Sequence, residues 1–312
     1  PQIVSAVRVF RRRMHAGDGT VVSIAGVGEV STRPAHERRG LARRLLELAV
    51  DRMVELGCAL SLLHTGSAAP LYAKLGWVPV DLHQASARLP TAVEAVSATP
   101  ALLTQVLTDE AAYVAALPQL QRLHRAYAAQ RTGPLERSGD YWRRWVWSEL
   151  EALRRLPSSA VAVVTAALPG ADTIVAYLVA RLRAGSAADG MPTVHVLELI
   201  CADGDGAVAV PQSQARSAVR GALWTAACAA LVPAATAVMA QGLEVDVADV
   251  AAAVLGTAAA DVVRECHRGH MVRLLPGGRE GPLAAPTAAA LAARLSSAPF
   301  TWLQLDGFCS AQ

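Results

Sequence analysis

Apolar and polar positions in the first part of the chain change between a period of two, typical of strands, and the wider spacing of helices. The elements predicted from this pattern are strands over residues 3–14, 21–32, 59–64 and 77–89 and helices over residues 40–57 and 67–75. Gly17, Asp18 and Gly19 supply a hairpin turn between the first two strands. Gly57 is well suited to end the longer helix, because glycine readily adopts the left-handed conformation of a helix C-cap.

Residues 91–101 interrupt this pattern, since they are rich in Ala, Thr, Ser and Pro and lack periodicity. Beyond them the sequence predicts helices over residues 111–130, 139–156 and 216–230, strands over residues 160–168, 173–183 and 194–200, and a short strand through Val238. Strands and helices that alternate in this way predict a mixed α/β (α+β) fold. We expect a first unit over residues 1–92, a second unit over residues 93–275 and a C-terminal tail over residues 276–312.

Composition and charge limit the partners that the chain can have. The 312 residues are 53% hydrophobic and 18% charged, which excludes a disordered chain. Lys and Arg total 29 against 26 Asp and Glu, and the resulting formal charge of +3 is too weak to favour nucleic acid as a partner. The uncharged residues 221–243 are mostly Ala and contain Pro233, so they predict a buried helix, a turn and a strand rather than a membrane span.

Five cysteines are widely separated, and none has the spacing of a metal ligand pair. They are Cys58, Cys201, Cys228, Cys266 and Cys309. We interpret them as reduced, mostly buried thiols of a cytoplasmic protein that binds no metal.

Residues 28–44, GEVSTRPAHERRGLARR, take the chain from a strand through a loop into a helix. The first backbone N–H groups of a helix have no partner within it and lie at the positive end of its dipole, so they attract phosphate groups. Gly40 leaves space where a phosphate must come close, and the small Ala42 keeps the next amide accessible. The neighbouring arginines add positive charge. This segment therefore predicts an anion site.

Residues 67–77, SAAPLYAKLGW, follow one strand after the anion loop. Together with residues 30–46 they resemble the GNAT superfamily of N-acetyltransferases, whose acetyl-CoA loop has the form [QR]xxG-x-[GA] and whose later LYxxLGF element carries a tyrosine. The resemblance implies that loop amides hold the coenzyme A pyrophosphate. It also implies that the preceding strand pairs its backbone with the pantetheine arm and that the tyrosine protonates the leaving thiolate.

Matched position by position, the resemblance gives Tyr72 the role of catalytic acid. The cofactor-binding positions that it implies are Val30, Thr32, Arg38, Arg39, Gly40, Leu41, Ala42 and Arg43. Glu37 departs from the family pattern, which has Gln or Arg at that place. Because the loop works mainly through backbone amides, we expect this acid to lower the affinity for the pyrophosphate without abolishing it.

Acetylation of an amine also needs a group that removes its proton. Glu29 is the first candidate base, because it lies beside Val30 on the strand that faces the cofactor. His64, at the end of the following strand, is the second. The sequence alone does not decide which of the two residues is the base.

Residues 120–146, LQRLHRAYAAQRTGPLERSGDYWRRWV, resemble the opening of the second domain in the Eis group, the enhanced intracellular survival acetyltransferases. That resemblance implies tandem GNAT-like domains, each a mostly antiparallel splayed sheet flanked by helices, of which the second is catalytically degenerate. Eis-like proteins assemble as homo-oligomers, so the resemblance makes a homo-oligomer possible here and leaves the oligomeric state open. Residues 71–77 are also similar to fungal lysine N6-acetyltransferases, which we rank second.

The resemblance implies an acetyl-CoA-dependent N-acetyltransferase. The acetyl group would pass to a primary amine, of a small molecule or of a lysine side chain, by direct attack in a ternary complex. The alternative is a non-catalytic acyl-CoA-binding sensor or scaffold with the same fold. Expected partners are acetyl-CoA and an amine acceptor, without nucleic acid or membrane.

Overall fold

The computed structural model describes residues 2–92, 102–170, 172–183, 191–202, 213–255 and 262–296. Within them, eleven strands form one mixed sheet in the order β5-β7-β8-β9-β10-β4-β11-β3-β2-β1-β6. Two pairs of neighbours, β2 with β3 and β9 with β10, are parallel, and the other described pairs are antiparallel.

One half of the sheet is built from both ends of the chain. Its strands are β1 (Ser5–Ala16), β2 (Val21–Thr32), β3 (Leu60–His64), β4 (Val78–Pro90) and β11 (Val263–Leu274). Its helices are the short turn η1 (Pro34–His36), α1 (Leu41–Glu55), α2 (Ala69–Lys74), the short turn η4 (Pro276–Gly278) and α7 (Ala288–Ser296). The predicted strand–helix alternation of residues 3–89 is confirmed.

The other half uses the middle of the chain. Its strands are β5 (Leu103–Val106), β7 (Ser159–Ala167), β8 (Ile174–Arg183), β9 (Thr193–Cys201) and β10 (Ala237–Leu243), and β6 (Thr132–Leu135) pairs across with β1. Its helices are α3 (Glu110–Ala129), a π-helix (Tyr141–Val146) that runs into α4 (Trp147–Arg154), α5 (Ser213–Leu231) and α6 (Glu244–Leu255).

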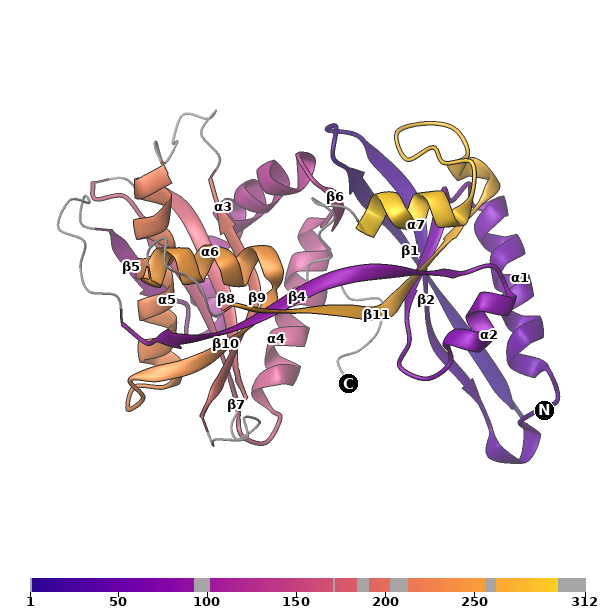
Figure 1. The fold of residues 1–312 in the computed structure, drawn as a ribbon, viewed down its shortest axis with the longest axis horizontal. Helices are drawn as coiled ribbons and strands as arrows, with labels where there is room; N and C mark the ends of the chain where they lie inside the picture. Colours follow the sequence, from indigo (N-terminus) through magenta and orange to yellow (C-terminus); the bar gives the residue numbers. More distant parts are fainter. Residues whose placement is uncertain are drawn as a thin grey trace.

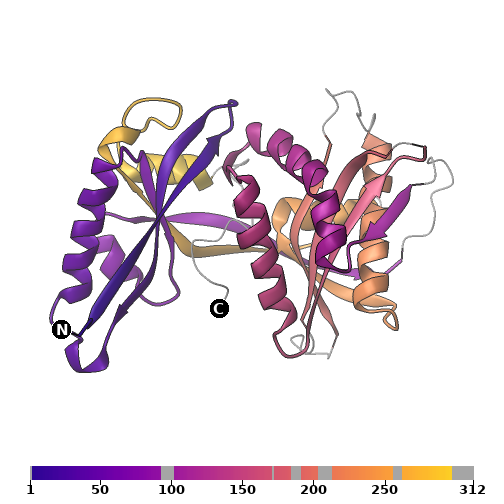
Figure 2. The ribbon, with the colours of Figure 1, turned by 180° about the vertical axis from the view of Figure 1, so that it is seen from behind.

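Two long strands connect the halves. Figures 1 and 2 show β4 and β11 running from one lobe into the other. The first part of β4 pairs with β11, and residues Gln84–Pro90 of β4 pair with β10 in the other lobe. The end of β11 lies between β4 and β3, where His270–Leu274 pair with Leu60–His64. The sheet is therefore continuous through both lobes.

Helices cover both faces of the sheet. In the first lobe, α1 contacts β1 and β2, whereas α7 contacts β4 and β11. The apolar core under α1 includes Leu46, Met53 and Trp77. A separate and larger core holds Leu291 of α7 together with residues of α3 and α4, so one apolar layer spans both lobes. In the second lobe, α5 and α6 pack on the opposite face from α3 and α4.

Several elements differ from the sequence expectations. The helices over 111–130 and 139–156 are present, although the second begins as a π-helix. Strands β5, β6 and β11 and helices α6 and α7 were not predicted. Both short strands owe their conformation to pairing with distant strands, and the Ala-rich α6 has no clear polar face. Most of the expected join, residues 93–101, lies outside the described residues.

The expected tail after Pro276 contains an ordered helix. Leu291 and Leu295 of α7 are fully buried, and the Ser296 hydroxyl accepts a 2.9 Å hydrogen bond from the Asp81 N–H on β4. Leucines at positions 291 and 295 lie on one face of a helix, and that spacing is the sequence signal for this packing. Residues 288–296 therefore belong to the packed structure.

Four cysteines fall in the described part of the chain, and all four are free thiols. Cys58 and Cys228 are buried, Cys201 is half-buried and Cys266 is exposed, so burial holds for only part of the set. Among the described helices, none combines the length and the apolar composition that crossing a membrane requires.

Candidate functional site

Strands β2 and β3 run side by side for three residue pairs only. Their parallel pairing joins Ile24–Gly26 to Leu60–Leu62. Beyond Gly26, β2 continues for six residues to Thr32, while β3 continues to His64. Since no pairing joins these described extensions, the two strands present free backbone groups toward each other. The gap between them is of the kind that can accept a ligand's amide groups as a third, short strand.

A β-bulge lies on the open part of β2. Between the pairs Arg8–Gly28 and Ala6–Ser31, two residues of β2 face the single residue Val7 of β1. Glu29 occupies the bulge with a φ of 53°, a conformation that few residues other than glycine adopt. The bulge redirects the strand where it leaves β3, so the strand pairing and the local backbone both open the gap.

Helix α1 begins just beyond the open end of β2. Its N-cap, Gly40, has a φ of 75°, and no side chain caps the first turn, which also contains no acidic residue. A Cβ atom added to Gly40 would meet nothing within 4 Å, so the approach to the helix N-terminus is open. Free N–H groups at the start of a 15-residue helix are the feature that the predicted anion site requires.

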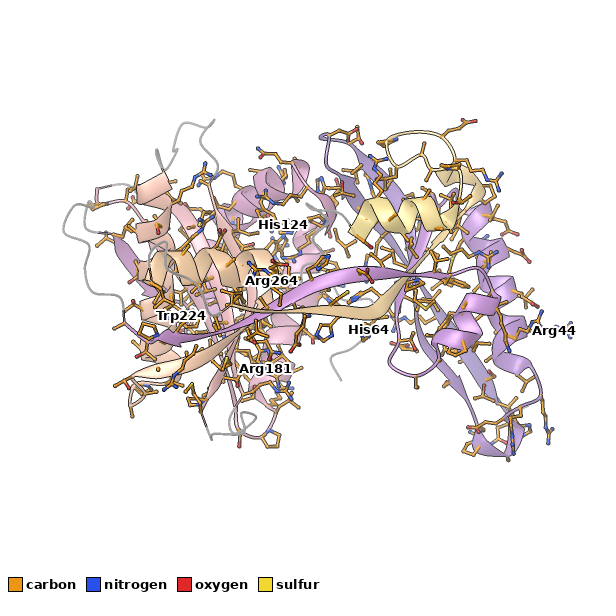
Figure 3. The ribbon with its side chains drawn as sticks, viewed as in Figure 1. Arg44, His64, His124, Arg181, Trp224 and Arg264 are labelled. Carbon is orange, nitrogen blue, oxygen red and sulfur yellow. The ribbon has the colours of Figure 1, made fainter. Side chains whose placement is uncertain are left out.

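The predicted cofactor residues all lie along this path. Val30 and Thr32 lie on the open part of β2, Arg38 and Arg39 lie in the turn after η1, and residues 40–43 start α1. Arg43 pairs with Glu47 at 2.9 Å, and Arg39 donates to the Ala35 carbonyl at 3.2 Å. Figure 3 shows Arg44 projecting from the outer surface of α1.

Tyr72 lies on the same face of the sheet as α1. It is on α2, its side chain is 7% exposed, and it belongs to the core that also contains Val27 of β2 and Leu63 of β3. Its ring meets that of Trp77 edge to face, with 6.0 Å between the ring centroids. The predicted acid is therefore held beside the point where β2 and β3 separate.

Glu29 is exposed and bound to a neighbouring strand. Its carboxylate accepts from the Arg8 guanidinium at 3.0 Å, and both side chains are more than half exposed. The structure thus places the first candidate base on the bulge itself, with a positively charged partner.

His64, the second candidate base, ends β3. Since side chains alternate along a strand, His64 points to the face opposite that of Leu63 and Tyr72. Its ring centroid lies 4.8 Å from that of His270 on β11, and Figure 3 shows His64 beside this strand. Burial and nearby His267 lower the pKa of His64. Burial, followed by the charges of His64 and His267, lowers the pKa of His270 to about 3.

Both imidazoles are thus favoured in the neutral form, in which a ring nitrogen can accept a proton. Sequence reasoning missed His270, because only the pairing of β11 with β3 brings it to the site. The described residues hold no group of three or more His, Cys, Asp or Glu side chains arranged to bind a metal.

The second lobe repeats the parallel pairing. Strands β9 and β10 pair from Thr193–Val196 to Met239–Gly242 and then separate. Glu198, on the part of β9 beyond this pairing, is fully buried and binds Arg137 through two hydrogen bonds of 3.1 and 2.7 Å. Tyr177 also donates to Glu198, and burial raises the pKa of Tyr177 well above its usual value. The corresponding strand of the second lobe therefore carries a buried ion pair.

Comparison with known proteins agrees with this geometry. Residues 1–80 match the family model described as an acetyltransferase (GNAT) domain. A search of curated proteins gives no match.

Among solved structures, a GCN5-related N-acetyltransferase from Anabaena variabilis is 17% identical, with a TM-score of 0.58, over 86% of this chain and 59% of that one. A probable N-acyltransferase from Enterococcus faecalis is 14% identical, with a TM-score of 0.60, over 88% and 59%. Eis1 from Mycobacterium abscessus is 18% identical, with a TM-score of 0.57, over 88% and 62%.

This chain thus spans about three-fifths of the length of these structures. At such identities the likeness concerns the fold. Residues 1–80 thus match a GNAT acetyltransferase domain, and the chain is similar in fold to solved GNAT N-acetyltransferases.

Proposed function

We propose that this protein is an acetyl-CoA-dependent N-acetyltransferase that acts on a primary amine. One observation carries the proposal: within a GNAT domain, the gap between β2 and β3 leads directly to the uncapped N-terminus of α1. An open strand edge followed by an anion site matches a ligand that has an amide-containing arm and a pyrophosphate. Acetyl-CoA is such a ligand.

Each predicted cofactor residue has a role in this proposal. Backbone groups of Val30 and Thr32 orient the pantetheine arm, and the amides of residues 38–43 hold the pyrophosphate. Gly40 admits the phosphates because its position faces open space. Exposed arginines around the start of α1 add charge attraction.

In the proposed reaction, the neutral amine attacks the thioester carbonyl directly and forms the C–N bond. The C–S bond then breaks, and the departing thiolate takes a proton from the Tyr72 hydroxyl. The proton lost by the amine goes to Glu29, or to His64 as the second candidate. Tyr72 and His64 lie on opposite faces of the sheet at the same gap, which keeps proton donation and proton removal apart.

We also propose that the chain contains two GNAT-like units over residues 1–92 and 93–275, as the tandem arrangement implies. Two parallel strand pairs that each separate, β2–β3 and β9–β10, support this division. Strand β11 of the second unit pairs with β3 in the first lobe, and β4 of the first unit pairs with β10 in the second, so the units exchange strands. Because the match to the acetyltransferase family model covers residues 1–80, the proposed acetyl-CoA site lies in the first unit.

Calorimetric titration of acetyl-CoA tests the cofactor site. We expect one site per chain in the wild type and loss of binding in Gly40→Glu. Gly170→Glu is the matched control, because Gly170 also has a φ of 75° and open space but lies between β7 and β8. Loss of binding in both variants would contradict the assignment, since it would reflect unfolding or charge alone.

Release of coenzyme A with a panel of primary amines tests the chemistry. We expect Tyr72→Phe to lower kcat about 100-fold while leaving acetyl-CoA binding intact, because general acid catalysis contributes at least that factor. Unchanged turnover would overturn the acid assignment. Binding of acetyl-CoA without turnover on any amine would instead support the alternative, a non-catalytic acyl-CoA-binding protein.

A further inference from the structure

A second cationic site lies at the junction of the two lobes. A cavity of about 810 Å³ is bounded by β1, the segment after β6, helix α3 and the π-helix. Its lining residues are Arg11, Arg12, Arg13, Ser23, Arg125, Glu136, Arg137, Ser138 and Tyr141. Five of these nine side chains are guanidinium groups and one is a carboxylate, so the lining is strongly positive.

The protein itself neutralises two of the five arginines. Arg13 pairs with Glu136 at 3.1 Å, and Arg137 pairs with the buried Glu198 at 2.7 Å. Among the described residues, no carboxylate forms an ion pair with Arg11, Arg12 or Arg125. About three positive charges therefore share one cavity without an internal counter-charge.

The guanidinium group of Arg12 has only part of its hydrogen-bonding capacity satisfied. Its guanidinium lies 5.4 Å from the centre of the Tyr141 ring, and one of its terminal nitrogens donates to the Arg11 carbonyl at 3.0 Å. Its Nε is buried and has no hydrogen-bond partner in the part of the chain that the structure describes. A buried donor without a partner is costly, and an anion in the cavity would supply both the acceptor and the charge.

The π-helix provides an independent indication. Six residues, Tyr141–Val146, adopt this rare conformation, which is frequent at functional sites. It places Tyr141 at the cavity beside Arg12.

The cavity is separate from the proposed phosphate site at the start of α1. Arg11–Arg13 pair with Ser23–Ala25, in the part of β2 that precedes the gap. From Ser23 to Thr32, next to the loop that leads into α1, the strand covers nine residue steps, or about 30 Å. The N-terminus of α1 and the cavity are therefore two different anion sites.

We propose that this cavity binds a small polyanion, a molecule with at least two phosphate or carboxylate charges. Arginine forks bind both groups through paired hydrogen bonds. The ligand would contact β1 in the first lobe and α3 and the π-helix in the second, and would thus fix the lobes relative to each other.

Calorimetric titration of the whole chain with pyrophosphate and, separately, with citrate tests the proposal. We expect saturable binding of at least one probe, weakened several-fold when the salt concentration is raised. Binding of pyrophosphate alone would identify phosphate ligands, and binding of citrate alone would identify polycarboxylates. Absence of binding of both probes at millimolar concentration would overturn the proposal.

Variants separate this cavity from the cofactor loop. In Gly40→Glu, which blocks the start of α1, probe binding is expected to persist. In the double variant Arg12→Gln/Arg125→Gln, probe binding should weaken at least tenfold. The control double variant Arg155→Gln/Arg52→Gln removes two exposed arginines elsewhere and should bind the probe as the wild type does. The opposite pattern would assign the anion to the cofactor loop and overturn the proposal.

Circular dichroism checks that the double variant folds. If it does not, Arg125→Gln alone serves, because this exposed side chain can be changed without disturbing a core. Acetyl-CoA binding is measured in parallel, so a failure of this proposal is distinguishable from a failure of the proposed activity.

Discussion

Arg137 and Glu198 form an ion pair from which water is fully excluded, since both side chains have no exposed surface. Arg137 also lies 4.8 Å from the centre of the Trp142 ring, and Tyr177 donates to Glu198. A buried pair contributes little over an apolar replacement, but a single remaining charge is strongly unfavourable.

We therefore expect Arg137→Met to lower the free energy of unfolding by about 3–5 kcal/mol, measured by urea denaturation. Arg155→Met, at a position that is 80% exposed, is the control and should stay within about 0.5 kcal/mol of the wild type. A change below about 1 kcal/mol for Arg137→Met would mean that water reaches Glu198 in solution.

Asp246 gives the protein a pH-dependent stability. Burial, followed by the charges of Asp249 and Glu198, raises its pKa to about 8, and its Oδ2 has no hydrogen-bond partner among the described residues. Between its unfolded and folded pKa values, the folded state holds a proton that the unfolded state has lost. The stabilisation that the folded state gains from keeping Asp246 protonated is complete at low pH and is lost as the pH rises toward about 8.

We expect Asp246→Asn to remove this pH-dependent loss of folding stability. Relative to the wild type, the variant should gain stability as the pH rises from about 5 to about 8, by at most about 1.4 kcal/mol per pH unit. Urea denaturation of both proteins at each pH measures the difference. A difference that stays constant with pH would show that Asp246 is ionised in the folded protein.

The two candidate bases can be separated by substitution. We expect Glu29→Gln to lower kcat about 100-fold with no change in acetyl-CoA affinity, because the amide cannot accept the proton. Arg8→Gln is the comparison, since it leaves the carboxylate and removes only its partner. A large loss in His64→Asn together with normal turnover in Glu29→Gln would assign proton removal to His64.

At the residue scale, local patterns predicted Gly40, Tyr72 and Glu29 as candidates, but not their surroundings. The left-handed φ of Gly40 and the open start of α1 are local properties, and residues 28–44 were sufficient to expect them. His270 and Arg137 were missed because each contacts its partner across a long stretch of chain. Charge and burial at these positions depend on tertiary pairing.

Gly242 lies on β10, between β9 and β4, at a position with no room for a larger residue. A Cβ atom on Gly242 of β10 would lie 2.6 Å from the Val196 carbonyl oxygen on β9, a backbone atom that cannot rotate away. We expect Gly242→Ala to destabilise the protein by about 1–3 kcal/mol, measured by thermal or urea unfolding. Gly66→Ala, which meets nothing within 4 Å, is the control and should be close to neutral.

At the element scale, periodicity predicted most helices and the long strands other than β11, because their own residues carry the pattern. It failed for β6, whose residues pair with Met14 and Ala16 of β1, and for α6, where Ala dominates both faces. The π-helix was not predicted either, because its sequence has the apolar spacing of an ordinary α-helix. Short or uniformly apolar elements depend on what they pack against.

The continuous sheet predicts that the two lobes depend on each other. Residues 1–92 alone would lack β11, which lies between β3 and β4, and α7, which covers β4. We expect this fragment to remain largely unfolded, with poor chemical-shift dispersion in an NMR spectrum, whereas the whole chain unfolds as a cooperative structure. A well-dispersed spectrum of the fragment would show that β3 and β4 hold together without β11.

At the scale of the whole molecule, the sequence by itself determined the mixed α/β class, the hairpin of β1 and β2, the anion loop and the resemblance to GNAT acetyltransferases. These depend on patterns within a few tens of residues. The tertiary structure alone decided the return of β11 and α7 to the first lobe and the cationic cavity at the junction. These features need contacts between segments more than 100 residues apart, such as His64 with His270 and Arg13 with Glu136, and such contacts leave no periodic signal in one sequence.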